Sequence, residues 1–110
     1  MRRGDVVTVS LPGDAGKPRP AVIVQTDILT AALRTVLVCP MTSYSSSPGI
    51  FRVTVEPTLE NGLHLPSEIM VEKLQAANHS RLGQHVGHLD DDTMRRLAQA
   101  LTVTLGLTEI

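Results

Sequence analysis

Residues 16–25 read GKPRPAVIVQ, a short loop that leads directly into an unbroken apolar run. The run from Pro20 to Gln25 is brief and almost wholly apolar, which is typical of a strand buried on both faces of a sheet. A second run of the same kind follows at Thr35 to Cys39. The sequence therefore predicts two central strands at these places.

Strand-like segments also lie on both sides of this pair. Val7, Val9 and Leu11 alternate with polar residues between Asp5 and Leu11, which predicts a strand with one apolar face. Three further strands are expected at residues 51–55, at Glu68 to Leu74 and, in twisted form, at Arg81 to His88. Proline, glycine and serine separate the segments, chiefly in the loops 11–18 and 42–49 and at Asn61-Gly62.

Helical patterns occur twice. One turn is expected at Asp27 to Leu33, with Asp27 as its cap, and a longer helix after Asp90 or Asp91. Gly106 is placed to end the second helix. The apolar stripe of this helix has helical spacing and consists of Met94, Leu97, Ala98, Leu101 and Leu105. Short strands followed by one amphipathic helix predict a mainly β (α+β) fold: a small SH3-like β-barrel of about five to seven strands.

The composition sets limits on function. With 110 residues and no repeat or linker, one domain spanning 1–110 is expected. A single cysteine, Cys39, excludes an intramolecular disulfide and fits a reducing cytoplasm, and neither a signal peptide nor a membrane span is expected. The net charge is −1, but residues 1–55 hold six basic and three acidic residues, whereas residues 56–110 hold four basic and eight acidic ones. Either this is chance scatter or an anionic partner meets the N-terminal half.

Metal and thiol chemistry find little support. His85 and His88 are three residues apart, but no third ligand stands at a convincing spacing, so no metal or other cofactor is expected. Cys39 lies in an apolar run and is interpreted as a core residue. No glycine-rich phosphate loop of the Walker or dinucleotide type is present in the sequence.

One segment stands out. Pro18 and Pro20 fix the backbone on either side of Arg19, so the arginine is presented from a rigid support unless it packs on its own barrel. Thr42 and Ser43 open the second loop, where their hydroxyls either take part in function or cap the strand end.

Three blocks of sequence resemble the signature blocks of the MazF/PemK (Kid) family of toxins from type II toxin–antitoxin systems. They read RGDVV at 3–7, KPRPAVIV at 17–24 and VCPMTS at 38–43. The later pairs Gly62-Leu63 and Pro66-Ser67, the triplet 81–83 and the terminal helix follow in the family's order, so the resemblance covers nearly the whole chain. One departure is the stretch MVEKL at 70–74, where the family usually carries an Asp-Gln or similar polar pair.

The resemblance implies a dimeric, cytoplasmic mRNA interferase, a hydrolase that cuts single-stranded RNA at short motifs and is neutralised by a MazE-like antitoxin. It places the catalytic pair at Arg19 and Thr42, with Asp14 as a possible assisting acid. RNA binding is expected from nearby loop residues, namely Lys17, Ser43, Tyr44, Ser45 and Arg52.

The chemistry suits these residue types. RNA carries its own nucleophile, the 2′-hydroxyl, so the enzyme needs to align it and to stabilise the charge that develops on the phosphate. Arg19 is a permanently charged donor that can bind two phosphate oxygens, and Thr42 is expected to donate a hydroxyl hydrogen bond to the same phosphate. The expected products are a 2′,3′-cyclic phosphate and a 5′-hydroxyl.

Two alternatives stay open at this point. Gyrase poisons of the CcdB type share this kind of fold and act through C-terminal helix residues, with no use for the pair Arg19 and Thr42. A non-catalytic SH3-like binding module is the other, because architecture alone does not choose a function.

Overall fold

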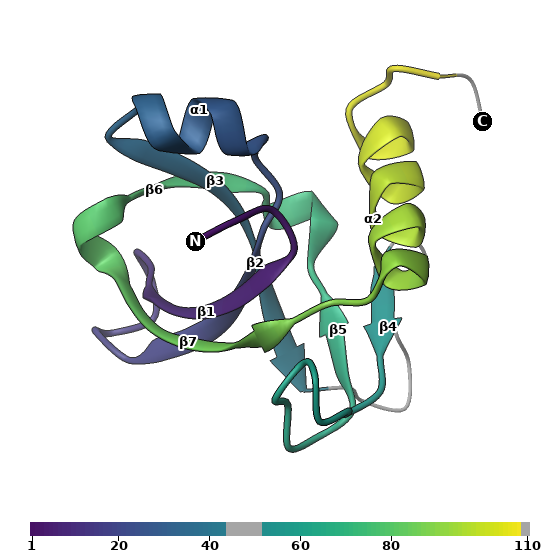
Figure 1. Ribbon diagram of the computed structural model, residues 1–110, viewed down its shortest axis with the longest axis horizontal. Coiled ribbons are helices and arrows are strands. Elements are labelled where there is room, and N and C mark those ends of the chain that lie inside the picture. Colours follow the sequence, from purple (N-terminus) through teal and green to yellow (C-terminus); the bar gives the residue numbers. More distant parts are fainter. Residues whose placement is uncertain (44–51, 109–110) are drawn as a thin grey trace.

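The structure is a computed structural model, and it describes residues 1–43 and 52–108 (Figure 1). Strands form most of the chain, and a C-terminal helix stands beside them. The strands are β1 (Asp5–Ser10), β2 (Pro18–Ile23), β3 (Thr35–Ser43), β4 (Val53–Val55), β5 (Ser67–Ile69), β6 (Gln75–Asn78) and β7 (Leu82–His88). The α helices are α1 (Asp27–Ala32) and α2 (Asp91–Thr104), and the short 3₁₀ helices are η1 (Val71–Lys73) and η2 (His79–Arg81).

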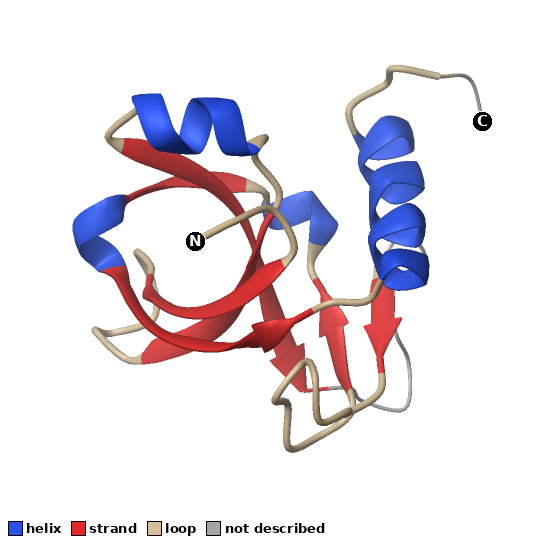
Figure 2. Cartoon of the chain, in the orientation of Figure 1, coloured by secondary structure: helices blue, strands red, loops and turns tan. Residues whose placement is uncertain are grey.

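All seven strands belong to one antiparallel sheet with the order β4-β5-β3-β2-β1-β7, and β6 also pairs with β3. The long strand β3 therefore changes partner along its length, from β6 at Thr35 to Val38 to β5 at Met41 to Ser43. Two register shifts between β1 and β7 add local twist, and the sheet curls strongly (Figure 2).

The predicted fold class, mainly β with a C-terminal helix, is confirmed. The expected barrel is incomplete, because no ladder among the described strands joins the two ends of the path and the sheet does not close on itself. The reason is the change of partner in β3: its last residues pair with β5, which pairs in turn with β4, and these two strands lead away from the curl towards α2.

Burial on both faces explains the apolar runs. Alternate residues of β1, β2 and β3 enter two separate cores, so that Val6 and Val22 pack on one side and Val7 and Ile23 on the other. The first core lies between the sheet and α2, and the second lies inside the curl. Each fully buried valine or isoleucine contributes about 1.5–3 kcal/mol, which favours these strands over any solvated alternative.

The C-terminal helix follows its predicted signals. The Asp90 carboxylate accepts a hydrogen bond from the Thr93 N–H at 2.7 Å, and Gly106 ends the helix with a φ of +70°. Met94 and Leu97 are buried against the first core, whereas Leu105, the last member of the stripe, is exposed. No helix within residues 1–43 and 52–108 is long and apolar enough to cross a membrane.

Three details differ from the sequence prediction. Asp27 does not cap α1: Thr26 holds that position without a side-chain bond, and the Asp27 carboxylate accepts from the Arg3 N–H at 2.6 Å. The strand expected at Glu68 to Leu74 is only β5, because the chain turns into η1 after the Met70 N–H bonds the Pro40 carbonyl. Strand β6 was not predicted, because its sequence QAAN has a low strand propensity. Its hydrogen-bonded pairing with β3 stabilises the extended conformation.

Candidate functional site

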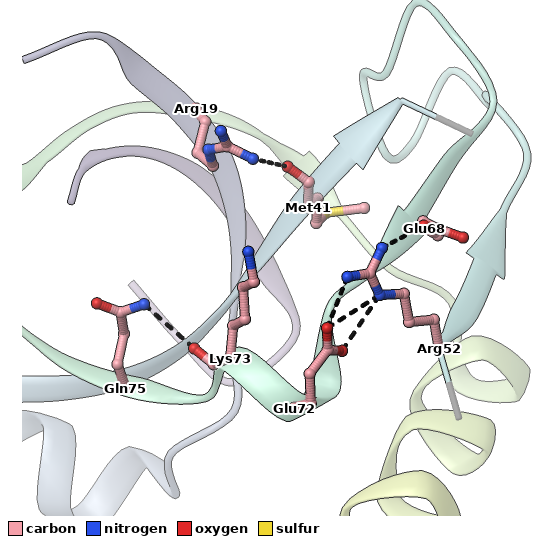
Figure 3. A network of polar contacts seen from close by, with 7 residues as sticks. All are labelled: Arg19, Met41, Arg52, Glu68, Glu72, Lys73 and Gln75. Atoms are coloured by element: carbon pink, nitrogen blue, oxygen red, sulfur yellow. Dashed lines mark hydrogen bonds and ion pairs between the residues drawn. The ribbon is translucent and has the colours of Figure 1, made fainter. Parts of the chain in front are cut away.

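Arg19 stands at the start of β2, where its guanidinium is held in a fixed orientation. Its Nε and Nη2 atoms donate to the two carboxylate oxygens of Asp14 at 2.9 Å and 3.1 Å. Its Nη1 atom donates to the Met41 carbonyl of β3 at 3.5 Å (Figure 3). About a third of the side chain, 34%, stays exposed, so Arg19 is positioned by the protein and still reaches solvent.

Thr42 lies beside this arginine. Ala21 is the last residue of β2 that pairs with β3, opposite Pro40, and beyond this pair Nη1 of Arg19 reaches the carbonyl of Met41, the residue before Thr42. Residues two apart in a strand share a face, so Arg19 and Thr42 lie on the same side of the sheet. Thr42 is half-buried and Ser43 is exposed. The structure thus brings the predicted catalytic pair to one place.

Asp14 reaches Arg19 through a tightly turned loop. Gly13, Ala15 and Gly16 all have positive φ, which costs little for glycine but of order 1–2 kcal/mol for alanine. The turn returns Asp14 onto Arg19, where its carboxylate neutralises the guanidinium. Lys17 is exposed in the same loop and lines an open hollow together with Asp14 and Arg19.

Arg52 is held by ion pairs within the protein. It forms one ion pair with Glu68 and another with Glu72, both drawn in Figure 3. The hydrogen bond from Arg52 holds the pKa of Glu72 below its ordinary value, and the two acids raise the pKa of Arg52. An incoming phosphate would have to displace two carboxylates to bind this arginine. Arg52 is therefore less available for RNA than the exposed Lys17.

Lys73 is a further cation at the site, and the sequence prediction did not include it. Helix η1 places Lys73 in the wall of a hollow of about 90 Å³ that Asp14, Arg19, Pro40 and Gln75 also line. In Figure 3 its ammonium group extends towards the side of the network where Arg19 lies. The departure from the family pattern at 70–74 was the signal in the sequence that could have identified it.

A larger hollow of about 380 Å³ adjoins the end of β3. Thr42 and Ser43 form part of its wall, and Leu63 and His64 from the segment after β4 form another part. The lining is chiefly apolar, so it suits a flat, weakly polar group. Two of the residues expected to bind RNA, Tyr44 and Ser45, lie outside the described residues.

Other reactive side chains have structural roles. Cys39 is fully buried in the first core, and burial raises the pKa of its thiol to about 12, so it is a core residue as predicted. The ring of His88 bonds the buried Asp5 carboxylate at 2.8 Å, and His85 approaches the same carboxylate at 3.5 Å. Among the residues that the structure describes, no three potential ligands gather in a way that could hold a metal ion.

A family model and a curated relative both match nearly the whole chain. Residues 2–105 match the family model described as PemK-like, MazF-like toxin of type II toxin-antitoxin system. A curated relative from Mycolicibacterium smegmatis, named probable endoribonuclease MazF, is 38% identical over 108 residues, which is 97% of this chain and 98% of that protein.

Solved structures of related proteins also match nearly the whole chain. The Mycobacterium tuberculosis toxin MazF-mt6 superimposes with a TM-score of 0.80 and 25% identity, covering 96% of this chain and 99% of that one. A mycobacterial endoribonuclease in complex with its cognate antitoxin gives a TM-score of 0.83 at 20% identity, covering 100% and 99% of the two chains. This second likeness establishes a shared fold.

Proposed function

Because the chain belongs to the PemK/MazF family of type II toxins and is an endoribonuclease toxin, we propose that it cleaves single-stranded RNA at short sequence motifs without a metal ion. The observation that carries this proposal is the placement of Arg19 beside the end of β3, on the face that Thr42 shares. A binding module or a gyrase poison has no need for such a pair.

Arg19 supplies charge stabilisation in the proposed reaction. The RNA 2′-hydroxyl attacks the adjacent phosphorus, the bond to the 5′-oxygen breaks, and the products carry a 2′,3′-cyclic phosphate and a 5′-hydroxyl. Negative charge grows on the phosphate oxygens as this happens, and a planar guanidinium can donate to two of them. The phosphate takes the place of the Asp14 carboxylate, which binds Arg19 in the same two-pronged manner.

The surroundings suit an RNA strand. Lys73 and Lys17 add positive charge near Arg19 and would bind the flanking phosphates. Thr42 would hold the reacting ribose-phosphate through its hydroxyl, and Ser43 extends this polar edge. The hollow of 380 Å³ beside Thr42 and Ser43 has room for a nucleobase next to the cleaved bond.

The partners follow from the same surface. A relative of the same fold is bound to its cognate antitoxin, and we propose that this chain is neutralised by a MazE-like antitoxin whose acidic tail occupies the Arg19 side of the site. We further propose that two copies form a homodimer and so extend the short groove of a single chain. Light scattering at micromolar concentration tests the dimer, and a monomer there would contradict it.

The central experiment is cleavage of a long single-stranded RNA by the purified protein in EDTA, with the ends of the fragments mapped chemically. We expect cutting at a recurrent short motif and fragments that end in a cyclic phosphate. A matched RNA with a 2′-deoxy nucleotide at the cut position serves as the control and should stay intact. Strict dependence on added Mg²⁺ or Zn²⁺, or cleavage of the deoxy control, would contradict the proposal.

A further inference from the structure

Glu68 is a buried acid whose position is not explained by the roles assigned so far. Only 3% of the residue is exposed, although it belongs to the polar network of Figure 3. One carboxylate oxygen accepts a hydrogen bond from Nη1 of Arg52 at 2.6 Å. The other, Oε2, is buried and has no hydrogen-bond partner among the described residues.

The sheet places this acid directly beside Thr42. In the ladder between β3 and β5, Glu68 is the register partner of Thr42, and in the ladder between β4 and β5 it is also the partner of Thr54. Cross-strand partners share a face, with Cβ atoms about 4.5–5.5 Å apart. Glu68 thus lies between two threonines on the face that carries Arg19, and only Thr42 is on the Arg19 side of it.

An unsatisfied carboxylate oxygen in a protein interior is costly, and a catalytic role is one of the reasons for which a native protein retains such a group. The Thr42 hydroxyl is a suitable donor, because a hydroxyl can donate one hydrogen bond and accept two. Thr42 is half-buried, so its oxygen can contact Glu68 on one side and a bound ligand on the other.

We propose that Glu68 is a positioning residue for Thr42: with RNA bound, its Oε2 accepts the Thr42 hydroxyl proton in a hydrogen bond, which leaves the Thr42 oxygen to accept from the RNA 2′-hydroxyl. This inference rests on the proposed function. It reverses the direction expected for Thr42, which now accepts from the nucleophile instead of donating to the phosphate. Arg52 holds the carboxylate in place through the other oxygen.

Glu68→Gln is the sharpest variant. The amide keeps the size of the acid, but it has only one oxygen, and Arg52 requires an acceptor there. The amide nitrogen must then face Thr42, so it donates to the threonine oxygen and turns the hydroxyl proton towards the RNA. We expect kcat to fall roughly 10- to 100-fold, the effect of one lost orienting hydrogen bond to a charged group, with KM for RNA nearly unchanged; thermal unfolding checks that the variant is folded.

Thr54 provides a matched control, because it is the other threonine beside Glu68. Thr42→Val should lower kcat, whereas Thr54→Val should leave it at the wild-type value. In the Thr42→Val background, Glu68→Gln should cause no further loss, while in the Thr54→Val background it should cause its full loss. Wild-type kcat in Glu68→Gln, or a full additional loss on top of Thr42→Val, would overturn the positioning role.

A second variant covers failure of Glu68→Gln to fold. Replacing the pair together, as Arg52→Leu with Glu68→Leu, leaves no unpaired buried charge, because Glu72, the other partner of Arg52, is 48% exposed, and such replacements are often neutral for stability. This double variant should also lose kcat, and wild-type kcat would overturn the inference. The two proposals fail separately: if Arg19→Ala abolishes cleavage and Glu68→Gln does not change it, the ribonuclease assignment stands and the role of Glu68 falls.

Discussion

Replacing Arg19 by alanine tests the site most directly. The guanidinium is the proposed source of charge stabilisation, and removal of one such donor from an oxyanion-type site costs about 10²–10³-fold in kcat, or roughly 2.7–4 kcal/mol. Arginine and lysine differ in geometry, so Arg19→Lys should recover only a small part of the rate, because an ammonium group cannot donate to two phosphate oxygens in a plane.

The same substitution should have little effect on folding. The ion pair with Asp14 is partly exposed, with 34% of the Arg19 side chain and 17% of the Asp14 side chain accessible, and pairs of this kind contribute about 0–1 kcal/mol. The backbone of Arg19 stays in its ladder with Val9. A loss of up to about 1 kcal/mol lowers the melting temperature by at most about 4–8 °C in a domain of this size.

The assay is single-turnover cleavage of an RNA that contains the mapped motif, in EDTA, together with thermal unfolding of each variant. Arg34→Ala is the matched control: it removes the same charge from an exposed residue just before β3, away from the Arg19 contacts. Arg34→Ala should cleave like the wild type. Cleavage by Arg19→Ala within about threefold of the wild type, or equal losses in both variants, would refute the assignment of Arg19.

Further predictions concern binding and stability. Lys73→Ala should raise the Kd for a non-cleavable RNA several-fold and flatten its salt dependence with little change in kcat, because Lys73 would contact phosphate and not the reacting atoms; filter binding at several salt concentrations measures the Kd, and single-turnover cleavage measures the rate. An acidic antitoxin tail should compete with a non-cleavable RNA and lose affinity as salt rises, and a titration that finds both bound together would contradict a shared site. Burial alone would raise the pKa of Asp5, but hydrogen bonds from His88 and the Arg2 N–H hold it below its ordinary value. The stabilisation is therefore present above the unfolded pKa and lost as pH falls through the folded one. Asp5→Asn should lower the free energy of unfolding by about 1–3 kcal/mol at pH 7, and by less in acid. Gly62→Ala should destabilise by more than about 1 kcal/mol in denaturant titrations, since Gly62 has a φ of +69° and an added Cβ would meet the Val86 carbonyl.

The sequence predicted the parts of the fold whose signals are local. The apolar runs at β2 and β3 identified the central strands, because residues buried on both faces leave no polar alternation. The cap at Asp90 and the glycine at 106 marked the ends of α2, because capping depends on residues a few positions apart. The motif with Arg19 between two prolines pointed to a residue that the structure places at the start of β2, beside the end of β3.

What the sequence did not predict depends on contacts between distant segments. Strand β6 has no strand pattern of its own and exists because β3 offers it a free edge. The pairing of Arg52 with Glu68 and Glu72 joins the residue before β4 to β5 and η1, and no spacing in the sequence reveals it. This network changes the interpretation of two residues. Arg52, which the sequence analysis expected to bind RNA, is paired with two carboxylates, and Glu68, which that analysis did not single out, is a buried acid.

The position of the site follows from the way β3 changes partners. On one side β3 pairs with β2 at Val38 to Pro40, and on the other side it pairs with β6 up to Val38 and with β5 from Met41. Its alternate side chains fill the core inside the curl and the core under α2. At this change of partner, polar side chains replace the apolar ones on the face of Arg19: Thr42 follows Pro40, and Glu68 lies opposite it. Two cores fix the backbone on both sides of the junction, so Arg19, Thr42 and Glu68 project from rigid strands. A site that stabilises charge in a transition state needs such a support, because donors that are already oriented lose little free energy in reorganising when the charge appears.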